Sequence, residues 1–331
     1  MDPITQGALG AALPQSVSNK EKIKTTTWLG CLAGMAPDID VFIQSPTDPM
    51  LFLEFHRQFT HSFAFIPFGA LLCSLIFYKW SKINLTWRQS YLVCLLGYGT
   101  HALLDACTTY GTQLFWPFSD LRVAWNTVSV VDPMVTIPLL ALVIIASRTG
   151  KPLYARLGLA WVLTYLALGL VQRDRAESAG WDLAKARGHD PVSLSAKPGF
   201  GAILLWKVIY EANDRYYVDA IRAGFDPQVY TGDSVTKLNI SRDLRWLDPE
   251  SQQANDLSRF AWFSNNYLAF DHKDANMVID MRYSILPNEI KALWGIRLNP
   301  TARKSEHVKY LAQRDSSPDR LQRLWTMLAG Q

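Results

Sequence analysis

The sequence has few cysteines, little net charge and no serine-nucleophile motif. None of its four cysteines falls in a C-x-x-C pair, and we expect all four to be small buried apolar residues. The net charge of +4 over 331 residues is spread over both halves, which makes no case for nucleic-acid binding. The G-x-S-x-G motif is absent, which disfavours a serine hydrolase.

Charged residues are also scarce in the first half of the chain. Residues 1–172 carry 20 charged side chains, whereas residues 173–331 carry 42. We therefore predict a membrane-embedded domain over residues 1–172 and a water-soluble region after it. The amino terminus lacks the basic stretch of a signal peptide, so we expect no cleavage there.

The first half contains long apolar runs. Four are clear: 62–78, 89–107, 133–147 and 154–172. Each is near the ~20 residues that a helix needs to cross ~30 Å of hydrocarbon. Two weaker segments, 3–17 and 25–37, are rich in small residues, and the G-x-x-x-G of Gly30 and Gly34 predicts close helix packing. We predict an α-helical multi-pass membrane domain of about four to six helices.

Basic residues in the loops predict the orientation of this domain. Three alternate loops hold nine lysines and arginines, whereas loops 38–61 and 106–132 hold only Arg57 and Arg122. Cytoplasmic loops are the ones enriched in lysine and arginine. We therefore predict an inner (cytoplasmic) membrane protein of a bacterium, with its polar loops and its carboxy-terminal domain in the periplasm.

The second half has the pattern of an α+β domain. Four segments rich in β-branched and aromatic residues show partial alternation: "GFGAILLWKVIYEA", "RYYVDAIRAGF", "NMVIDMRYSIL" and "IKALWGIRL". They predict a mostly antiparallel sheet, and residues 248–262 and 317–329 have helical patterns. We predict a soluble α+β domain over residues 199–331, joined to the membrane domain by a polar connector at residues 173–198.

Polar residues gather at one predicted level of the membrane, at the outer ends of the apolar segments. They are Gln6, Asp38, Asp40, His56, His61, His101, Asp105 and Asp132. Unrelated positions would be scattered over both faces, and ionisable residues inside a membrane usually mark a functional site. Taken singly, each has a structural explanation, such as a helix cap or a His–Asp pair that braces a helix.

The spacing H-x-x-x-D places His101 and Asp105 on one helix face, one turn apart. His61 and an aspartate of "APDID", Asp38 or Asp40, would bring a bound ion to four ligands. His56 is a further candidate ligand. Imidazole and carboxylate together favour zinc, with manganese or another divalent ion as the alternative. A cation would also offset the cost of burying these groups.

Four ordered blocks of the sequence carry a resemblance to a known family. The blocks "MDPITQGALGAA", "APDID", "HRQFTHS" and "HALLDACTTYGTQLFWPFSD" resemble the YdjM-like family of inner-membrane proteins, described as metal-dependent hydrolases. That family is distantly similar to zinc-dependent phospholipase C. The resemblance implies one or two zinc ions held by Asp38 or Asp40, His61, His101 and Asp105. Many members have a histidine where this chain has Gln6, and an amide is a poor zinc ligand.

We therefore expect a membrane-embedded hydrolase that cleaves a phosphoester in a membrane lipid or a lipid-linked small molecule at the outer face. The ion would activate water, with Asp40 or Asp132 as general base and Arg57 as phosphate ligand. Two non-catalytic alternatives stay open. One is a transporter whose acids and histidines carry ions. The other is a periplasmic binding or assembly protein with a structural metal, which a fully occupied ligand set would favour.

Overall fold

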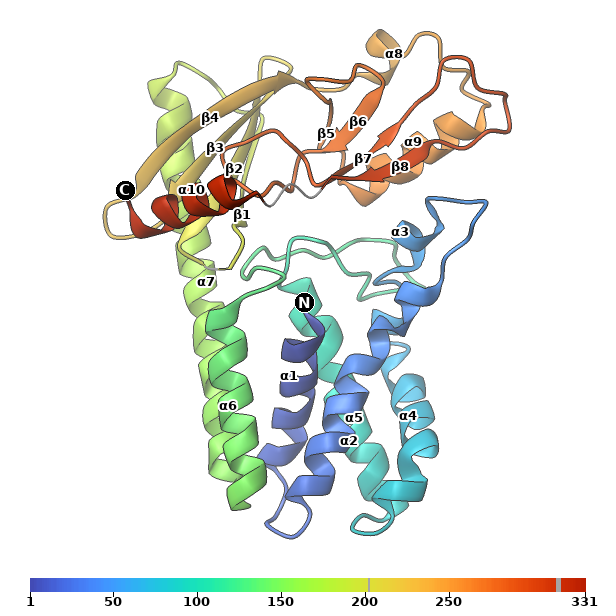
Figure 1. Cartoon of the computed structure of the whole chain (residues 1–331), viewed down its shortest axis with the longest axis vertical. Helices are drawn as coiled ribbons and strands as arrows, with labels where there is room; N and C mark the ends of the chain where they lie inside the picture. Colours follow the sequence, from blue (N-terminus) through green and yellow to red (C-terminus); the bar gives the residue numbers. More distant parts are fainter. Residues whose placement is uncertain (202, 314–316) are drawn as a thin grey trace. The chain divides into compact units, whose positions relative to one another are not determined.

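The computed structural model describes residues 1–201, 203–313 and 317–331 (Figure 1). These residues form two compact units. The first unit consists of Met1–Ile43 and Phe55–Leu170, and the second consists of Gln44–Glu54 and Val171–Gln331. The first is helical and the second contains the β-sheets, so the predicted order of a helical region followed by an antiparallel-sheet domain is confirmed.

Each of the six predicted apolar segments coincides with a helix. The helices of the first unit are α1 (Pro3–Ser16), α2 (Ile23–Met35), η1 (Ala36–Phe42), η2 (Phe59–His61), α4 (Ile66–Ser81), α5 (Trp87–Ala106), α6 (Pro133–Thr149) and the first part of α7 (Pro152–Ala186). Local caps set their beginnings. The Asp2 side chain accepts a hydrogen bond from the Thr5 amide at 3.0 Å to begin α1. A capping box of Thr86 and Gln89 begins α5.

Among the described residues, α7 is the one helix that is both long and apolar enough to cross a membrane by itself. The bent pair Leu51–His61 and Ile66–Ser81 would add a second span if the two helices count as one. Helix α6 is apolar but shorter, and α1 and α2 have 14 and 13 residues against the ~20 needed. The helical domain is therefore confirmed, while the number of crossings stays a prediction.

Glycines bring α1, α2 and α5 into direct backbone contact. A Cβ atom on Gly34 would lie 2.8 Å from the Cα of Gly10, and one on Gly97 would lie 2.6 Å from the Gly30 carbonyl oxygen. No larger side chain fits at these positions unless the helices separate. The G-x-x-x-G spacing thus brings together the three helices whose ends surround the site described below.

The second unit contains two four-stranded antiparallel sheets, each with its strands in sequence order. The first has β1 (Ser193–Pro198), β2 (Leu205–Ala212), β3 (Arg215–Arg222) and β4 (Gln228–Thr236). The second has β5 (Leu268–Phe270), β6 (Met277–Asp280), β7 (Trp294–Arg297) and β8 (Lys309–Ala312). Its helices are α8 (Ile240–Asp243), α9 (Gln252–Phe263), α10 (Pro318–Ala329) and most of α3 (Leu51–Phe55). Ile209 and Val218 of the first sheet share a buried core with Met277 and Ile279 of the second.

Candidate metal centre

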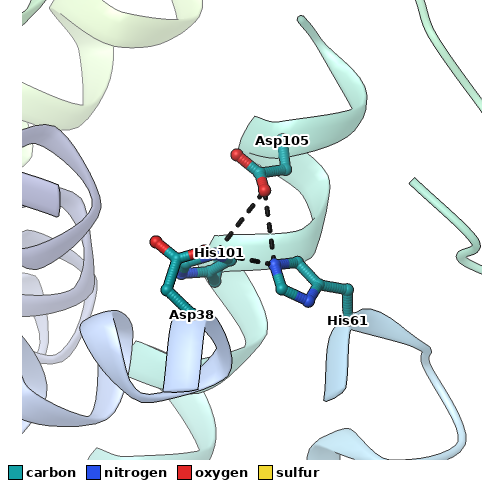
Figure 2. A group of neighbouring side chains, drawn as sticks. All are labelled: Asp38, His61, His101 and Asp105. Carbon is teal, nitrogen blue, oxygen red and sulfur yellow. Dashed lines mark ion pairs between the residues drawn. The ribbon is translucent and has the colours of Figure 1, made fainter. Parts of the chain in front are cut away.

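Four side chains from three parts of the first unit converge on one point (Figure 2). Asp38 comes from η1, directly after α2, and His61 comes from η2, directly before α4. His101 and Asp105 project from the last turns of α5, one turn apart as their spacing predicts. One ligand atom of each residue lies within 4.8 Å of the corresponding atoms of the other three.

The separations between these atoms fit a tetrahedral ion. The Nε2 atom of His61 lies 3.3 Å from Asp105 Oδ2 and 3.6 Å from Asp38 Oδ1. The Nε2 atom of His101 lies 3.3 Å from Asp38 Oδ1 and 3.6 Å from Asp105 Oδ2. With metal–ligand bonds of ~2.1 Å, the edge of a zinc tetrahedron is about 3.4 Å. These four of the six separations are close to that edge, and all six lie within 4.8 Å.

Three of these four atoms are buried and make no hydrogen bond. They are His61 Nε2, His101 Nε2 and Asp105 Oδ2, the last of which forms an ion pair with Arg57. Most buried polar atoms in proteins have a partner, and one left without it is costly. A cation at the point these atoms share would satisfy the two imidazole nitrogens, so the residues present fit a metal ion.

Hydrogen bonds at the other ring nitrogens fix both histidines. The Nδ1 atom of His101 lies 2.6 Å from the carbonyl oxygen of Gly34. A carbonyl oxygen only accepts, so Nδ1 carries the proton and Nε2 presents its lone pair to the centre. The Nδ1 atom of His61 lies 2.9 Å from Thr60 Oγ1 and 3.2 Å from Asp40 Oδ2. Partners of this kind orient metal-binding histidines and raise their basicity.

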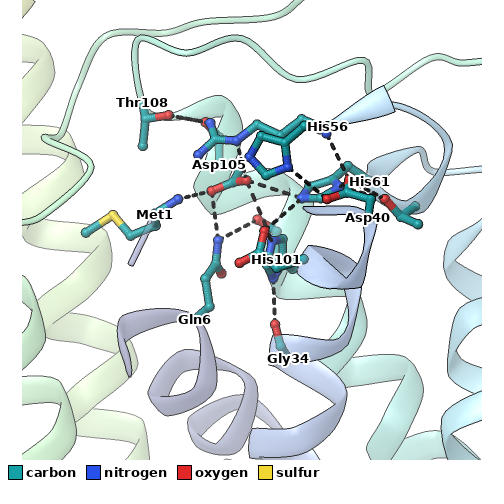
Figure 3. A network of polar contacts seen from close by, with 12 residues as sticks. Met1, Gln6, Gly34, Asp40, His56, His61, His101, Asp105 and Thr108 are labelled. Atoms are coloured by element: carbon teal, nitrogen blue, oxygen red, sulfur yellow. Dashed lines mark hydrogen bonds and ion pairs between the residues drawn. The ribbon is translucent and has the colours of Figure 1, made fainter. Parts of the chain in front are cut away.

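Asp40 braces the segment that carries His56 and His61 (Figure 3). Its Oδ2 accepts from the Arg57 amide at 2.9 Å and from Thr60 Oγ1 at 2.8 Å, and its Oδ1 lies 2.8 Å from His56 Nδ1. Burial raises the pKa of Asp40, but hydrogen bonds from His56 and His61 outweigh that effect and hold it well below the usual range. Asp40, Asp38 and His56 also form a second group that could hold an ion.

Two hydrogen-bond donors and one ion-pair partner surround Asp105, which is fully buried. Arg57 Nε lies 2.9 Å from Asp105 Oδ2, and the Gln6 side-chain amide donates to Oδ1 at 2.9 Å. The amino group of Met1 also donates to Oδ1. Gln6, which the sequence places at the outer end of the first apolar segment, is therefore a hydrogen-bond donor to a candidate ligand.

Arg57 is buried next to the centre. Its Nη1 donates to Thr108 Oγ1 at 2.8 Å, and its guanidinium lies 4.7 Å from the centre of the Tyr110 ring. The sequence indicated a phosphate ligand from residue type alone. In the structure the guanidinium pairs with Asp105, and the role of phosphate ligand stays a prediction.

Asp132 lies elsewhere in the first unit. Its carboxylate caps α6 through the Met134 amide at 3.1 Å and accepts from the Tyr165 hydroxyl at 2.9 Å. Among the described residues, no group of potential metal ligands includes it. Its predicted role as general base stays a prediction without support from these contacts.

The sequence interpretation missed Gly34, Thr60, Thr108 and the amino group of Met1. Gly34 carried a signal, because the G-x-x-x-G places its backbone where helices meet, and Thr60 lies inside the block "HRQFTHS". The centre is closed on most sides. The side chains of His61, His101 and Asp105 are fully buried, whereas that of Asp38 is 26% exposed and that of His56 is 21% exposed. Access is therefore on the side of Asp38 and His56.

Comparison with known proteins agrees with the membrane character of the first unit. The curated relative "Uncharacterized protein YfhP" of Bacillus subtilis (strain 168) is 29% identical over 164 residues, which are 49% of this chain and 48% of that protein. The chain thus spans about half the length of the relative it matches. No solved structure matches the chain. Residues 1–176, more than half of the chain, match the family model "YdjM inner membrane protein", and the protein therefore belongs to the YdjM family of inner membrane proteins.

Proposed function

We propose that the protein is a membrane-embedded, metal-dependent hydrolase whose substrate is a phosphoester in a lipid or lipid-linked molecule. The observation that carries the proposal is the convergence of the ligand atoms of Asp38, His61, His101 and Asp105, three of them buried without a hydrogen bond. These residues would hold one divalent ion, for which zinc is the best match to two imidazoles and two carboxylates. Bound there, the ion supplies a Lewis acid and makes water a stronger acid.

The residues around the ligands have distinct roles in this proposal. His56 is partly exposed, and Asp40 Oδ1 engages its Nδ1 at 2.8 Å, so Nε2 is the atom that accepts a proton from water. Asp40 is a positioning residue for His56 and His61. Arg57 positions Asp105 and reduces the repulsion between the carboxylates of the cluster. An ion at the second group, Asp38, Asp40 and His56, would instead give a stoichiometry of two.

Exposed apolar side chains beside the open edge support a lipid substrate. In η1, Asp38 and Asp40 alternate with Ile39 and Val41, which are 66% and 44% exposed, and the following Phe42 is 81% exposed. Apolar residues that border a polar site and face outward suit a ligand with an acyl chain. The membership in an inner-membrane family also supports a substrate of this kind.

A structural metal centre is the second candidate. Four protein ligands fill a tetrahedron, and structural zinc sites are usually closed in this way, whereas catalytic sites keep one position open. The partial exposure of Asp38 favours the catalytic function, because that ligand is the one that can make room for water. Both candidates require a bound metal ion, but only the hydrolase requires catalytic activity.

Elemental analysis of detergent-purified protein tests the shared part. The unmutated protein should contain one divalent transition metal per chain, and His61→Ala, His101→Ala and Asp105→Ala should each lose most of it. The matched control is His272→Ala, whose side chain is half exposed on the second unit and should leave the metal content unchanged. A metal-free native protein that also fails to bind added zinc would eliminate both candidates.

Incubation with a lipid extract separates the candidates. We expect products, identified by mass spectrometry, that disappear with chelator, with His101→Ala and with His56→Gln. His56→Gln should keep its metal at the four-ligand centre, so loss of turnover without loss of metal would identify a catalytic role. A native protein that holds its metal yet gives no product over a range of lipids and metals would favour the structural centre.

A further inference from the structure

Helix α7 changes character where it enters the second unit. Its apolar stretch ends at Val171, and Arg173, Asp174 and Arg175 follow within one turn. A membrane span that reaches water shows this kind of transition. Residues 172–175 therefore mark the depth of the membrane surface along α7, and side chains bound to them lie at nearly the same depth.

One end of the first sheet is bound to this part of α7. The Gln172 side-chain amide donates to the carbonyl oxygen of Ala223 at 3.0 Å, and the Arg175 guanidinium lies 5.2 Å from the centre of the Phe225 ring. Ala223 follows the last residue of β3 and donates to the carbonyl oxygen of Leu204 at 2.7 Å. The strands are antiparallel and in sequence order, so the connections β1–β2 and β3–β4 lie at the same end of the sheet. This is the end that contacts residues 172–175 of α7.

Large apolar side chains are exposed at this end. Phe225 is 94% exposed and Leu204 is 42% exposed. The opposite end of the same sheet has Asn213 and Asp214 at the β2–β3 turn, and it also exposes one apolar side chain, Val192, which is 80% exposed. A phenylalanine that is 94% exposed at a turn tip gains nothing from water, so Phe225 indicates an apolar or interfacial neighbour at its own end of the sheet.

Helix α10 adds to the same end. Its buried Leu324 and Met327 pack on Leu205 and Ala220 of the sheet, while Trp325 is 69% exposed. Arg222, the last residue of β3, donates to the carbonyl oxygen of Leu328 at 2.9 Å and fixes the end of the helix there. Helices with arginines on one side and tryptophan and leucine on another are typical of membrane surfaces.

We propose that this end of the first sheet, together with α10, rests on the surface of the membrane from which α7 emerges. Leu204, Phe225 and Trp325 enter the boundary between headgroups and acyl chains. Tryptophan is enriched at that depth, and Arg175 is placed to bind lipid phosphate while it remains stacked on Phe225. The second unit is thereby held at the bilayer surface by its own residues in addition to its connection through α7.

Site-specific photocrosslinking in reconstituted liposomes of phosphatidylethanolamine and phosphatidylglycerol tests the proposal. Benzoylphenylalanine replaces Phe225, Trp325 or, as the matched control at the opposite end of the sheet, Asn213. Leu163, which is 68% exposed in the apolar part of α7, gives the reference for a buried-in-lipid position. All four positions are exposed, and because Asn213 has a φ of 52°, which disfavours an aromatic residue, a melting temperature equal to that of the native protein is required of each variant.

We expect lipid adducts at 163, 225 and 325 and several-fold fewer at 213. Lipid adducts at position 163 without adducts at 225 and 325 would overturn the proposal. Equal amounts of lipid adduct at 213 and 225 would overturn it as well. Adducts of 225 with a second protein chain would identify a protein partner and would also overturn it. Absence of lipid adducts at 163 would show that the apolar part of α7 does not lie in the membrane, and this would also overturn the proposal. The metal content plays no part in this readout, so the result is independent of the proposed hydrolase.

Discussion

The Nδ1 atom of His101 lies 2.6 Å from the carbonyl oxygen of Gly34, so a ligand of the candidate metal centre is oriented by a backbone atom at a helix–helix contact (Figure 3). Gly34 is where α2 touches α1, because a Cβ atom there would lie 2.8 Å from both Gln6 O and Gly10 Cα. Helix packing and ligand geometry therefore depend on the same residue. Hydrogen-bond partners of this kind typically change metal affinity 10- to 100-fold when they are lost.

We expect Gly34→Ala to lower metal affinity by roughly 10- to 100-fold, because separation of α1 and α2 moves the carbonyl that orients His101. Competition with a chromophoric chelator measures the affinity. The matched control is Gly99→Ala, where the nearest heavy atom to the added Cβ is Ile66 Cγ2 at 3.8 Å, an ordinary contact. Equal affinities for the two variants would show that the contact does not support the site.

The helices were predictable because each apolar run is a local signal. The association of Gln44–Glu54 with the second unit was not predictable, since it depends on contacts such as Arg259 with Asp48, 211 residues apart in sequence. The number of membrane crossings also does not follow from the helices themselves. Several of them are shorter or less apolar than a helix that crosses a membrane by itself, so length and composition do not decide whether they cross.

The residues of the site were predictable as a group, but the separate role of each residue was not. The spacing of His101 and Asp105 specifies one helix face, whereas "APDID" offered two aspartates without a means to choose. Residues two apart on a helix point in different directions, but which of positions 38 and 40 faces the ligand atoms depends on how η1 packs against η2 and α5. Asp38 faces the ligand atoms and Asp40 faces the His56 segment. No local pattern could report this.

Membrane orientation is the next prediction. Nine basic residues lie in three alternate loops against two in the others, so we expect the carboxy terminus to be periplasmic. Alkaline phosphatase fused after Gln331 should be active, and a β-galactosidase fusion at the same position should be inactive. The reverse pattern would place the candidate site on the cytoplasmic side and would remove the outer leaflet as the source of its substrate.

Arg259 of α9 should influence the metal centre through the chain. It forms two hydrogen bonds of 2.9 Å with the carboxylate of Asp48 and also pairs with Glu54. These acids belong to the segment Gln44–Glu54, which connects Asp40 to His56 in sequence. Release of the segment would increase the freedom of the Asp40–His56 pair, since bidentate arginine–carboxylate pairs restrict geometry.

We expect Arg259→Met to lower turnover several-fold and to leave metal at the four-ligand centre largely in place. Turnover on the lipid substrate and elemental analysis measure the two effects. Arg242→Met is the control, because Arg242 forms exposed ion pairs with Asp214 and Asp243, which lie outside that segment. Unchanged turnover in Arg259→Met would show that Arg259 stabilises the second unit and does not influence the metal centre.

Two buried lysines make the second unit sensitive to pH. Lys197 and Lys207 are paired across β1 and β2 and are 5% and 3% exposed. Burial lowers the pKa of each to about 7, and at Lys197 the charge of Arg282 contributes to that lowering. In the unfolded chain their pKa returns to about 10.4. Between these values the unfolded state binds a proton that the folded state does not, so the free energy of unfolding rises with pH.

The expected slope is about 1.4 kcal/mol per pH unit for each lysine between about pH 7 and pH 10, and it vanishes below about pH 7, where both states are protonated. The melting temperature of the purified protein should therefore rise from pH 7 to about pH 9. Lys197→Met should raise the melting temperature at pH 7 and reduce the slope, because it removes one buried amine and keeps a side chain of similar length. Lys309→Met, at an exposed position of β8, should retain the native slope. A slope in Lys197→Met equal to that of the native protein would mean that this amine keeps its ordinary pKa in the folded state.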